Sequence, residues 1–111
     1  MDLRRIKYFV AIVEEGNISL AAKKLNMAQP PLSQQLKILE DEINTKLFDR
    51  NTRKLELTVE GKFFYSKCME ILEIIDRSTE EMNELKNGVS GSLNLGIIPV
   101  SYTHLEPTRP Y

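Results

Sequence analysis

Residues 28–43 read AQPPLSQQLKILEDEI, and this stretch decides the fold. Pro30 and Pro31 suit the first turn of a helix, where backbone N–H groups have no intrahelical partner, so the helix is expected to begin near Gln29. Apolar residues follow at steps of four, three and four, at Leu32, Leu36, Leu39 and Ile43. The opposite face is short, polar and mildly basic, with Pro30, Ser33, Gln34 and Lys37. The stretch therefore indicates a helix with one buried face and one exposed polar face.

Two helices are expected before this stretch. Residues 2–15 carry apolar side chains at steps of three and four, with Asp2 available as the N-cap and a glycine as the stop. Ser19 is a suitable N-cap for a short second helix over Leu20–Leu25, and Asn26 can then adopt the left-handed turn conformation. Three helices, with a tight turn between the second and the third, are thus predicted.

A basic hairpin is expected after the third helix. Residues 47–48 and 55–57 are typical of two short strands around a turn that reads RNTRK at residues 50–54. Thr58 can cap the helix that follows the hairpin. Positive charge gathers in the turn of this hairpin, on Arg50, Arg53 and Lys54.

A long helix is predicted next. From Val59 to about Asn87 the chain lacks proline, so about 29 residues can form one helix about 44 Å long at about 1.5 Å per residue. This length exceeds what a lone surface helix of so small a domain needs. Apolar residues repeat along it at heptad spacing, which is typical of a helix that pairs with a second copy. The expected dimerisation seam consists of Phe64, Cys68, Ile71, Ile75, Met82 and Leu85.

The composition changes after Gly88. Gly88, Ser90 and Gly91 are expected to form a flexible link, after which residues 93–98 alternate and then turn apolar like a strand. Residues 101–111 contain two prolines and follow neither helix nor strand spacing. An assembly or cloning junction near Val100, with a non-native tail beyond it, is the hypothesis that this shift suggests.

Composition and charge favour a folded protein of the cytoplasm. Hydrophobic residues make up 41% and charged residues 28%, as in ordinary globular proteins. The first residues do not form a secretion signal or a membrane-spanning run, and the single Cys68 cannot form an intrachain disulfide. The net charge of −1 divides unevenly: residues 1–65 hold 11 Lys/Arg and 9 Asp/Glu, whereas residues 66–88 hold 3 and 6. The balance alone is weak evidence for nucleic-acid binding, so the placement of the cations has to carry it.

Three helices followed by a basic hairpin are what a reader of the DNA major groove requires. Gln29 and Gln34 can each exchange two hydrogen bonds with adenine, while Lys37 can meet a phosphate or guanine. The acidic end of the third helix, residues 40–42, would be repelled by phosphate, so only its first half is expected to lie deep in the groove. The candidate DNA-binding residues are Ser19, Gln29, Pro30, Ser33, Gln34, Lys37, Arg50, Arg53 and Lys54.

Catalytic, metal and cofactor sites are not expected. The sequence offers no evident nucleophile and base pair, and His104, the single histidine, lies in the irregular tail. Cys68 is interpreted as a packing residue rather than a redox centre, because no second cysteine exists. An enzyme is therefore not predicted.

Residues 1–61 resemble the amino-terminal domain of the LysR-type transcriptional regulators, through MDLRRIKYFVAIVEEGNISLAAKKL, AQPPLSQQLKILEDEI and LFDRNTRKLELTVEG. GSLNLGIIP further resembles the first strand of that family's effector-binding domain. The resemblance implies dimerisation through the linker helix and a small-molecule effector that binds only where the further domain is present. Position 34 is often arginine in this family, and glutamine there favours adenine over guanine. The DNA contacts that the resemblance implies are Gln29, Pro30, Ser33, Gln34 and Arg53.

We therefore expect a mainly α fold, a winged helix-turn-helix with three helices and a two-stranded wing, followed by a long dimerisation helix. The expected segments are the DNA-binding domain at 1–58, the linker helix at 59–88, the start of an effector domain at 89–100 and the tail at 101–111. The expected function is sequence-specific transcription regulation in the bacterial nucleoid, as a homodimer or a higher oligomer on double-stranded DNA, away from membranes. The alternative is a dimerising helical interaction module that does not bind DNA.

Overall fold

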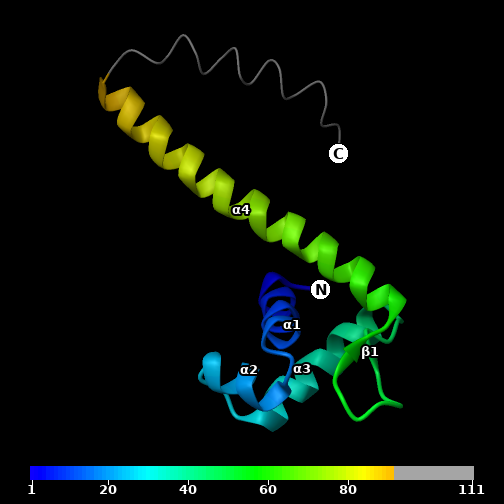
Figure 1. The fold of residues 1–111 in the computed structure, drawn as a ribbon. Helices are drawn as coiled ribbons and strands as arrows, with labels where there is room; N and C mark the ends of the chain where they lie inside the picture. Colours follow the sequence, from blue (N-terminus) through cyan, green and yellow to red (C-terminus); the bar gives the residue numbers. More distant parts are fainter. Residues whose placement is uncertain (92–111) are drawn as a thin grey trace. The chain divides into compact units, whose positions relative to one another are not determined.

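A computed structural model describes residues 1–91. The chain divides into a first compact unit, Met1–Leu72, and a second, Glu73–Tyr111. The predicted mainly α fold with a two-stranded antiparallel wing is confirmed. The elements follow in the order α1 (Leu3–Glu15), α2 (Ile18–Lys24), α3 (Gln29–Glu42), β1 (Phe48–Asp49), β2 (Glu56–Leu57) and α4 (Val59–Gly91) (Figure 1).

Helix α1 begins and ends where the sequence predicts. The Asp2 side chain accepts a hydrogen bond from the backbone N–H of Arg5 at 2.9 Å, and this bond holds the pKa of the Asp2 carboxyl below its ordinary value. Gly16 closes the helix in the left-handed conformation, with φ of 72°. Arg5, in the unfavourable first turn, pairs with Gln35 and Glu42 of α3 at 2.8 and 3.3 Å, which offsets its poor position in the helix dipole.

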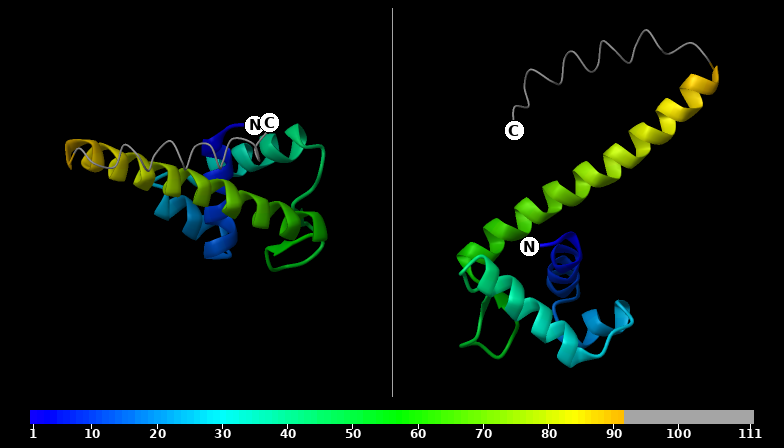
Figure 2. Two further views of the ribbon diagram at one scale, coloured as in Figure 1. Left: turned by 90° about the horizontal axis from the view of Figure 1, so that it is seen from above. Right: turned by 180° about the vertical axis from the view of Figure 1, so that it is seen from behind.

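Helix α2 begins earlier than predicted. Its N-cap is Asn17, whose side chain accepts from the N–H of Leu20 at 3.0 Å, so the prediction of Ser19 as the cap is wrong. Asn17 has the extended backbone that a cap requires, with φ of −162° and ψ of 130°, whereas Ser19 already lies inside the helix. Asn26 adopts the left-handed conformation after the helix, as predicted, with φ of 57°. The turn brings α2 beside the first turns of α3 (Figure 2).

Helix α3 begins at Gln29, as predicted, after Ala28, which provides no side-chain cap. Leu32, Leu36 and Leu39 are buried as expected. Glu40, however, is only 1% exposed, so the expectation that it would join Asp41 and Glu42 as an exposed acid facing phosphate is wrong. Its burial has a physical reason, because its carboxylate accepts hydrogen bonds from the strand that follows.

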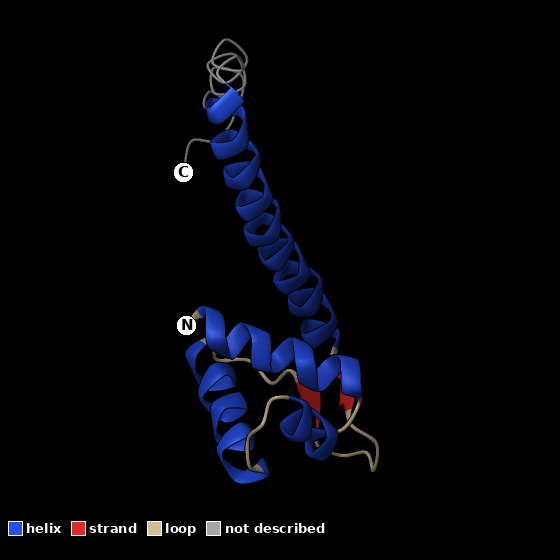
Figure 3. Ribbon diagram, turned by 90° about the vertical axis from the view of Figure 1, so that its left-hand side faces the viewer, coloured by secondary structure: helices blue, strands red, loops and turns tan. Residues whose placement is uncertain are grey.

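The wing, residues 48–57, consists of β1, a turn and β2. The strands pair antiparallel, with Phe48 opposite Leu57 and Asp49 opposite Glu56, one residue away from the expected limits (Figure 3). Local hydrogen bonds shape the turn: Asn51 N–H donates to the Asp49 carboxylate at 2.9 Å, and Thr52 hydroxyl donates to the carbonyl of Lys54 at 2.6 Å. The turn itself is exposed.

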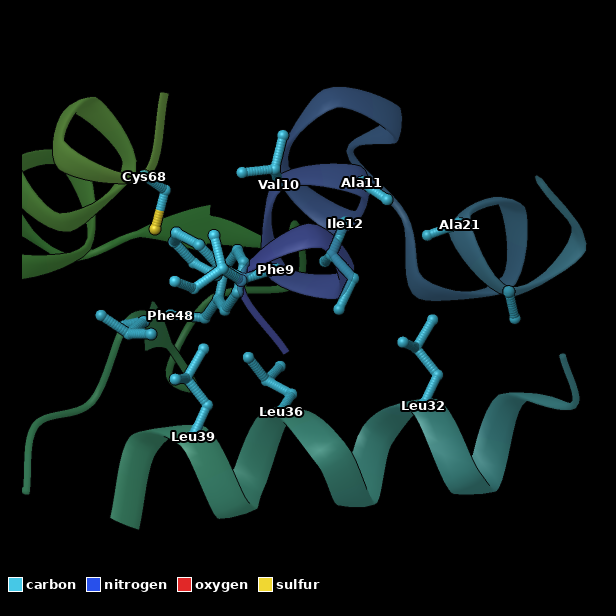
Figure 4. Close-up of a cluster of buried hydrophobic side chains, with 13 residues drawn as sticks. Phe9, Val10, Ala11, Ile12, Ala21, Leu32, Leu36, Leu39, Phe48 and Cys68 are labelled. Carbon is cyan, nitrogen blue, oxygen red and sulfur yellow. The ribbon is translucent and has the colours of Figure 1, made fainter. Parts of the chain in front are cut away.

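Phe9 of α1 lies at the centre of the apolar core. Its ring contacts those of Phe48, Phe64 and Tyr65, with centroids 5.6, 5.4 and 6.4 Å away. These contacts join α1 to the wing and to the first part of α4, and the leucines of α3 close the core from another side (Figure 4). Burying several such rings supplies the main apolar stabilisation of this unit.

The first two positions of the predicted dimerisation seam belong to this core instead. Cys68 is 0% exposed, and Phe64 is half-buried against Phe9, so both contribute to the core; their part in dimerisation stays a prediction. The first turns of α4 pack on the core through Phe64, Tyr65 and Cys68. In the first unit, α4 instead leaves Phe63 and Ile71 exposed.

The second unit is described from Glu73 to Gly91, where α4 continues. Ile74 and Met82 are each 55% exposed there, while Ile75 and Leu85 are half-buried. The helix runs to Gly91 and does not end at Gly88 as expected. The strand expected within residues 89–100 and the tail at 101–111 lie outside the described residues, apart from the last helical positions.

The Cys68 thiol is expected to be unreactive in the folded protein. Burial raises its pKa to about 11, so the thiol stays protonated at pH 8, and the core also shields it from reagents. Labelling with a chromogenic disulfide should be slow in buffer and fast in about 8 M urea, where the domain is unfolded. Because the folded state holds this proton more tightly, stability should fall as pH rises above the thiol's ordinary pKa toward about 11. Rapid labelling in buffer at pH 8 would contradict the burial.

Gly61→Ala should destabilise the protein although alanine favours helices. An added Cβ would overlap the carbonyl oxygen of Leu47 and lie 2.9 Å from Leu57 Cδ2. We expect the free energy of unfolding to fall by about 1–3 kcal/mol, measured by urea titration followed by circular dichroism. Lys62→Ala, at the exposed neighbouring position, is the control and should change it by less than about 0.5 kcal/mol. A more stable Gly61→Ala variant would show that α4 does not approach the wing this closely.

Candidate nucleic-acid interface

A groove of about 600 Å³ lies between the start of α2, the start of α3 and the wing. We call it the basic groove, because two wing cations line it. It brings together four of the predicted DNA-binding residues, from three separate elements: Ser19, Gln29, Arg53 and Lys54. The remaining lining residues are Gly16, Asn17, Ile18, Leu55 and Glu56.

Ser19 and Gln29, which both line the basic groove, contact each other. The Ser19 hydroxyl donates to Gln29 Oε1 at 2.7 Å, and both side chains are exposed. With Oε1 turned toward α2, the Gln29 amide keeps its N–H₂ group for an outside acceptor. Ser19 therefore orients a side chain at the first position of α3, a role that differs from the predicted cap.

The exposed face of α3 continues from the groove. Pro30, Gln34 and Lys37 are exposed and Ser33 is half-buried, all on the face opposite the leucine stripe, as the spacing predicts. None of these four lines the basic groove. The candidate interface therefore has two parts, the groove itself and the polar face of α3 beside it.

The predicted cations differ in their partners. Within residues 1–91, Lys37, Arg53 and Lys54 take part in no ion pair. Arg50, by contrast, pairs with Glu40 Oε1 through a 2.7 Å contact while its side chain stays 49% exposed. The three unpaired cations can accept an anionic partner without breaking an internal contact, whereas Arg50 has its charge partner inside the protein.

Two residues of this region escape prediction from the sequence. Asn17 lines the groove and caps α2, and the available signal was its position directly after Gly16, where the chain leaves α1. Glu40 anchors the wing, and the signal was its place four residues after the buried Leu36. A charged residue at such a position indicates a buried partner for it.

Two other classes of site find no support in the part of the chain that the structure describes. Histidine, cysteine and acidic side chains do not gather there in any group of three that could hold a metal. No helix among these residues combines the length and the apolar character needed to cross a membrane.

Comparisons with known proteins agree with this geometry. Residues 3–62 match the profile of the bacterial regulatory helix-turn-helix proteins of the lysR family. The chain is 50% identical over 97 residues to the HTH-type transcriptional regulator BsdA of Bacillus subtilis (strain 168), covering 86% of this chain and 33% of BsdA. It is 45% identical over 97 residues to the HTH-type transcriptional regulator BudR of Klebsiella aerogenes, covering 87% of this chain and 68% of BudR. The chain thus spans about a third of the length of BsdA.

The fold is also similar to that of solved structures. A crystal structure of a BenM_DBD/catB site 1 DNA complex has a TM-score of 0.76 and 41% identity, covering 79% of this chain and 95% of that one. The resemblance predicted from residues 1–61 is therefore confirmed. On the profile match, the identity with these regulators and the shared fold, the chain belongs to the LysR family of bacterial regulatory helix-turn-helix proteins.

Proposed function

We propose that this chain is the DNA-binding part of a transcription regulator, and that it reads double-stranded DNA with α3 and the wing. The observation that carries the proposal is the basic groove, where Gln29 at the start of α3 faces the same opening as Arg53 and Lys54. The relatives are described as HTH-type transcriptional regulators, and the similar BenM structure is a complex with DNA.

In this proposal α3 enters the major groove with its exposed face, and the wing meets the neighbouring backbone. Gln34 lies on that face, exposed and one turn after Pro30, so its amide is suited to the hydrogen-bonding edge of adenine. Lys54 presents an unpaired point charge, which suits phosphate. Arg53, beside it, can insert into a narrow minor groove, where the negative potential is strongest.

We propose a homodimer through α4. Cys68 and Phe64 pack in the core, so the proposed seam keeps the other four predicted positions, Ile71, Ile75, Met82 and Leu85. Their steps of four, seven and three residues keep them on one side of the helix, where a second copy can cover them. Two half-sites on DNA would then be read by one dimer.

The same reasoning extends to the remaining expectations. We propose a non-catalytic protein that works without a cofactor in the bacterial cytoplasm, because its relatives are described as transcriptional regulators. The alternative of an interaction module without DNA binding is not favoured. It explains neither the three unpaired cations nor the fold that this chain shares with the protein in a DNA complex.

Base reading and phosphate anchoring should separate between two variants. Gln34→Ala should weaken binding to the preferred duplex by about 1–3 kcal/mol, relax the preference at one base pair and leave the salt dependence almost unchanged. Lys54→Ala should weaken all sequences about equally and lower the salt slope by about one unit. Fluorescence anisotropy on a small duplex library at several salt concentrations measures both effects.

Lys7→Ala, which removes an exposed cation of α1 outside the groove, is the control for net charge and should change neither quantity. Arg53→Ala should reduce binding to A·T-rich flanks more than to G·C-rich flanks. If Gln34→Ala weakens all sequences equally while Lys54→Ala alters base preference, the proposed orientation on DNA is wrong.

Ile75→Asp should produce monomers that still fold. The charge would be buried without a partner in the seam beside Ile71 and Met82, and the dimer Kd should rise by roughly a hundredfold or more. Light scattering at micromolar concentration and circular dichroism report association and folding separately. Asn87→Asp adds the same charge two residues after Leu85, on the opposite side of the helix, and should stay dimeric. A dimeric Ile75→Asp variant would reject the seam.

A further inference from the structure

The side chain of Glu40 joins the end of α3 to both sides of β1. Its Oε2 accepts from the backbone N–H of Leu47 at 2.8 Å and, more weakly, from that of Phe48 at 3.4 Å. Its Oε1 accepts from the Arg50 guanidinium at 2.7 Å. Leu47 and Phe48 stand at the entry of β1 and Arg50 directly after its exit, so one carboxylate holds the strand at both ends.

Burying a carboxylate costs free energy. Its charge must lose water, and this cost is offset only when its oxygens are fully hydrogen-bonded, as they are for Glu40. Within the described residues, no buried side-chain nitrogen or oxygen lacks a partner. Hydrogen bonds are directional, so Glu40 fixes the direction in which the chain enters the wing, which a packed leucine would not do.

The wing has little else of its own to fix its orientation. Its two strands pair through two residue pairs, Phe48 with Leu57 and Asp49 with Glu56, and a two-stranded ribbon is at best marginally stable alone. At the other end, Thr58 donates through its N–H to the carbonyl of Leu47 at 3.0 Å. The place of the wing beside α3 therefore depends on these polar anchors together with the packing of Phe48 against Phe9.

Glu40, which anchors the wing, and the proposed base-reading end lie on the same helix, α3. Gln29 is the first residue of α3 and lines the basic groove, while Glu40 lies eleven residues later, about 16 Å along the helix axis. Arg53, three residues beyond Arg50, returns to line the groove beside Gln29. A rigid helix with the wing anchored near its end thus sets the separation between Arg53 and the start of α3.

We propose that Glu40 and Arg50 are positioning residues for DNA binding, which hold the wing so that Arg53 reaches the nucleic acid. This inference rests on the proposed function. Arg50 then acts through Glu40 inside the protein, and its expected contact with phosphate is not its role. Substitution of Glu40 or Arg50 leaves the Arg53 side chain itself unchanged but allows the wing that carries it to move.

A double-mutant cycle between Arg50 and Arg53 tests the proposal. Arg53→Ala should weaken duplex binding about tenfold in the parent protein and less than about threefold in the Arg50→Ala background, because the arginine is already misplaced there. The salt slope should fall by about one unit in each single variant and not fall further in the double variant. Arg50→Lys should restore most of the affinity, since an ammonium can still reach the carboxylate of Glu40.

Glu40→Gln is the second variant, and it cannot act by direct contact because the side chain is buried. It should reproduce the affinity and salt slope of Arg50→Ala at a temperature where circular dichroism shows both proteins folded. If it does not fold, Arg50→Ala, at a half-exposed position, keeps the test open. Additive losses for Arg50 and Arg53, with a separate unit of salt slope for each, would overturn the proposal and make Arg50 a phosphate contact.

A measurement without DNA separates this proposal from the proposed function. The backbone amide of Asn51, in the wing turn, should show increased mobility by NMR relaxation in Arg50→Ala and not in the control Lys46→Ala, whose side chain is exposed and outside every ion pair of residues 1–91. An unchanged wing overturns the positioning role even if DNA binds. A loosened wing in a protein that binds no duplex would instead overturn the proposed function.

Discussion

Among the described residues, Glu40 is the one polar or charged residue that is buried, and its carboxylate joins α3 to β1 and to the turn of the wing in the unit Met1–Leu72. It binds the N–H of Leu47, and the carbonyl of the same residue accepts from the N–H of Thr58 at 3.0 Å. Thr58 in turn accepts from the N–H of Gly61 at 2.9 Å and so caps α4. The end of α3, the wing and the start of α4 are therefore joined by one continuous series of hydrogen bonds.

Apolar packing supports the same junction from the other side. Phe48, the first residue of β1, directly follows Leu47, and its ring contacts that of Phe9 of α1 at a centroid distance of 5.6 Å. Phe9 also contacts Phe64 of α4, so one ring of α1 packs against both the strand that the carboxylate holds and the start of α4. In the turn of the wing, Arg50 pairs with the same carboxylate at 2.7 Å. Arg53 and Lys54 remain exposed and take part in no ion pair within residues 1–91, while these contacts hold the two strands.

The sequence predicts what local rules decide. Asp2 and Gly16 bound α1, and the paired prolines start α3, because caps and backbone restrictions act within one turn. The prediction of Ser19 as the cap fails because Asn17 is an equally suitable residue type. The point at which the chain leaves α1 decides which of the two caps α2. Glu40 escapes prediction for a different reason, since only the folded strand supplies the N–H groups that make its burial tolerable. Of the interface, the exposed face of α3 follows from spacing, whereas the groove needs three elements to meet.

Helix α4 shows where spacing alone cannot decide. A heptad pattern identifies apolar positions on a helix but not what covers them, and the positions of the one predicted seam on α4 differ in burial. Cys68 and Phe64 complete the core with Phe9, whereas Ile71 of the same seam and the neighbouring Ile74 are exposed. The residues of α4 that pack in the core are therefore distinct from its exposed apolar residues, and a substitution at an exposed position can test association without removing a core contact.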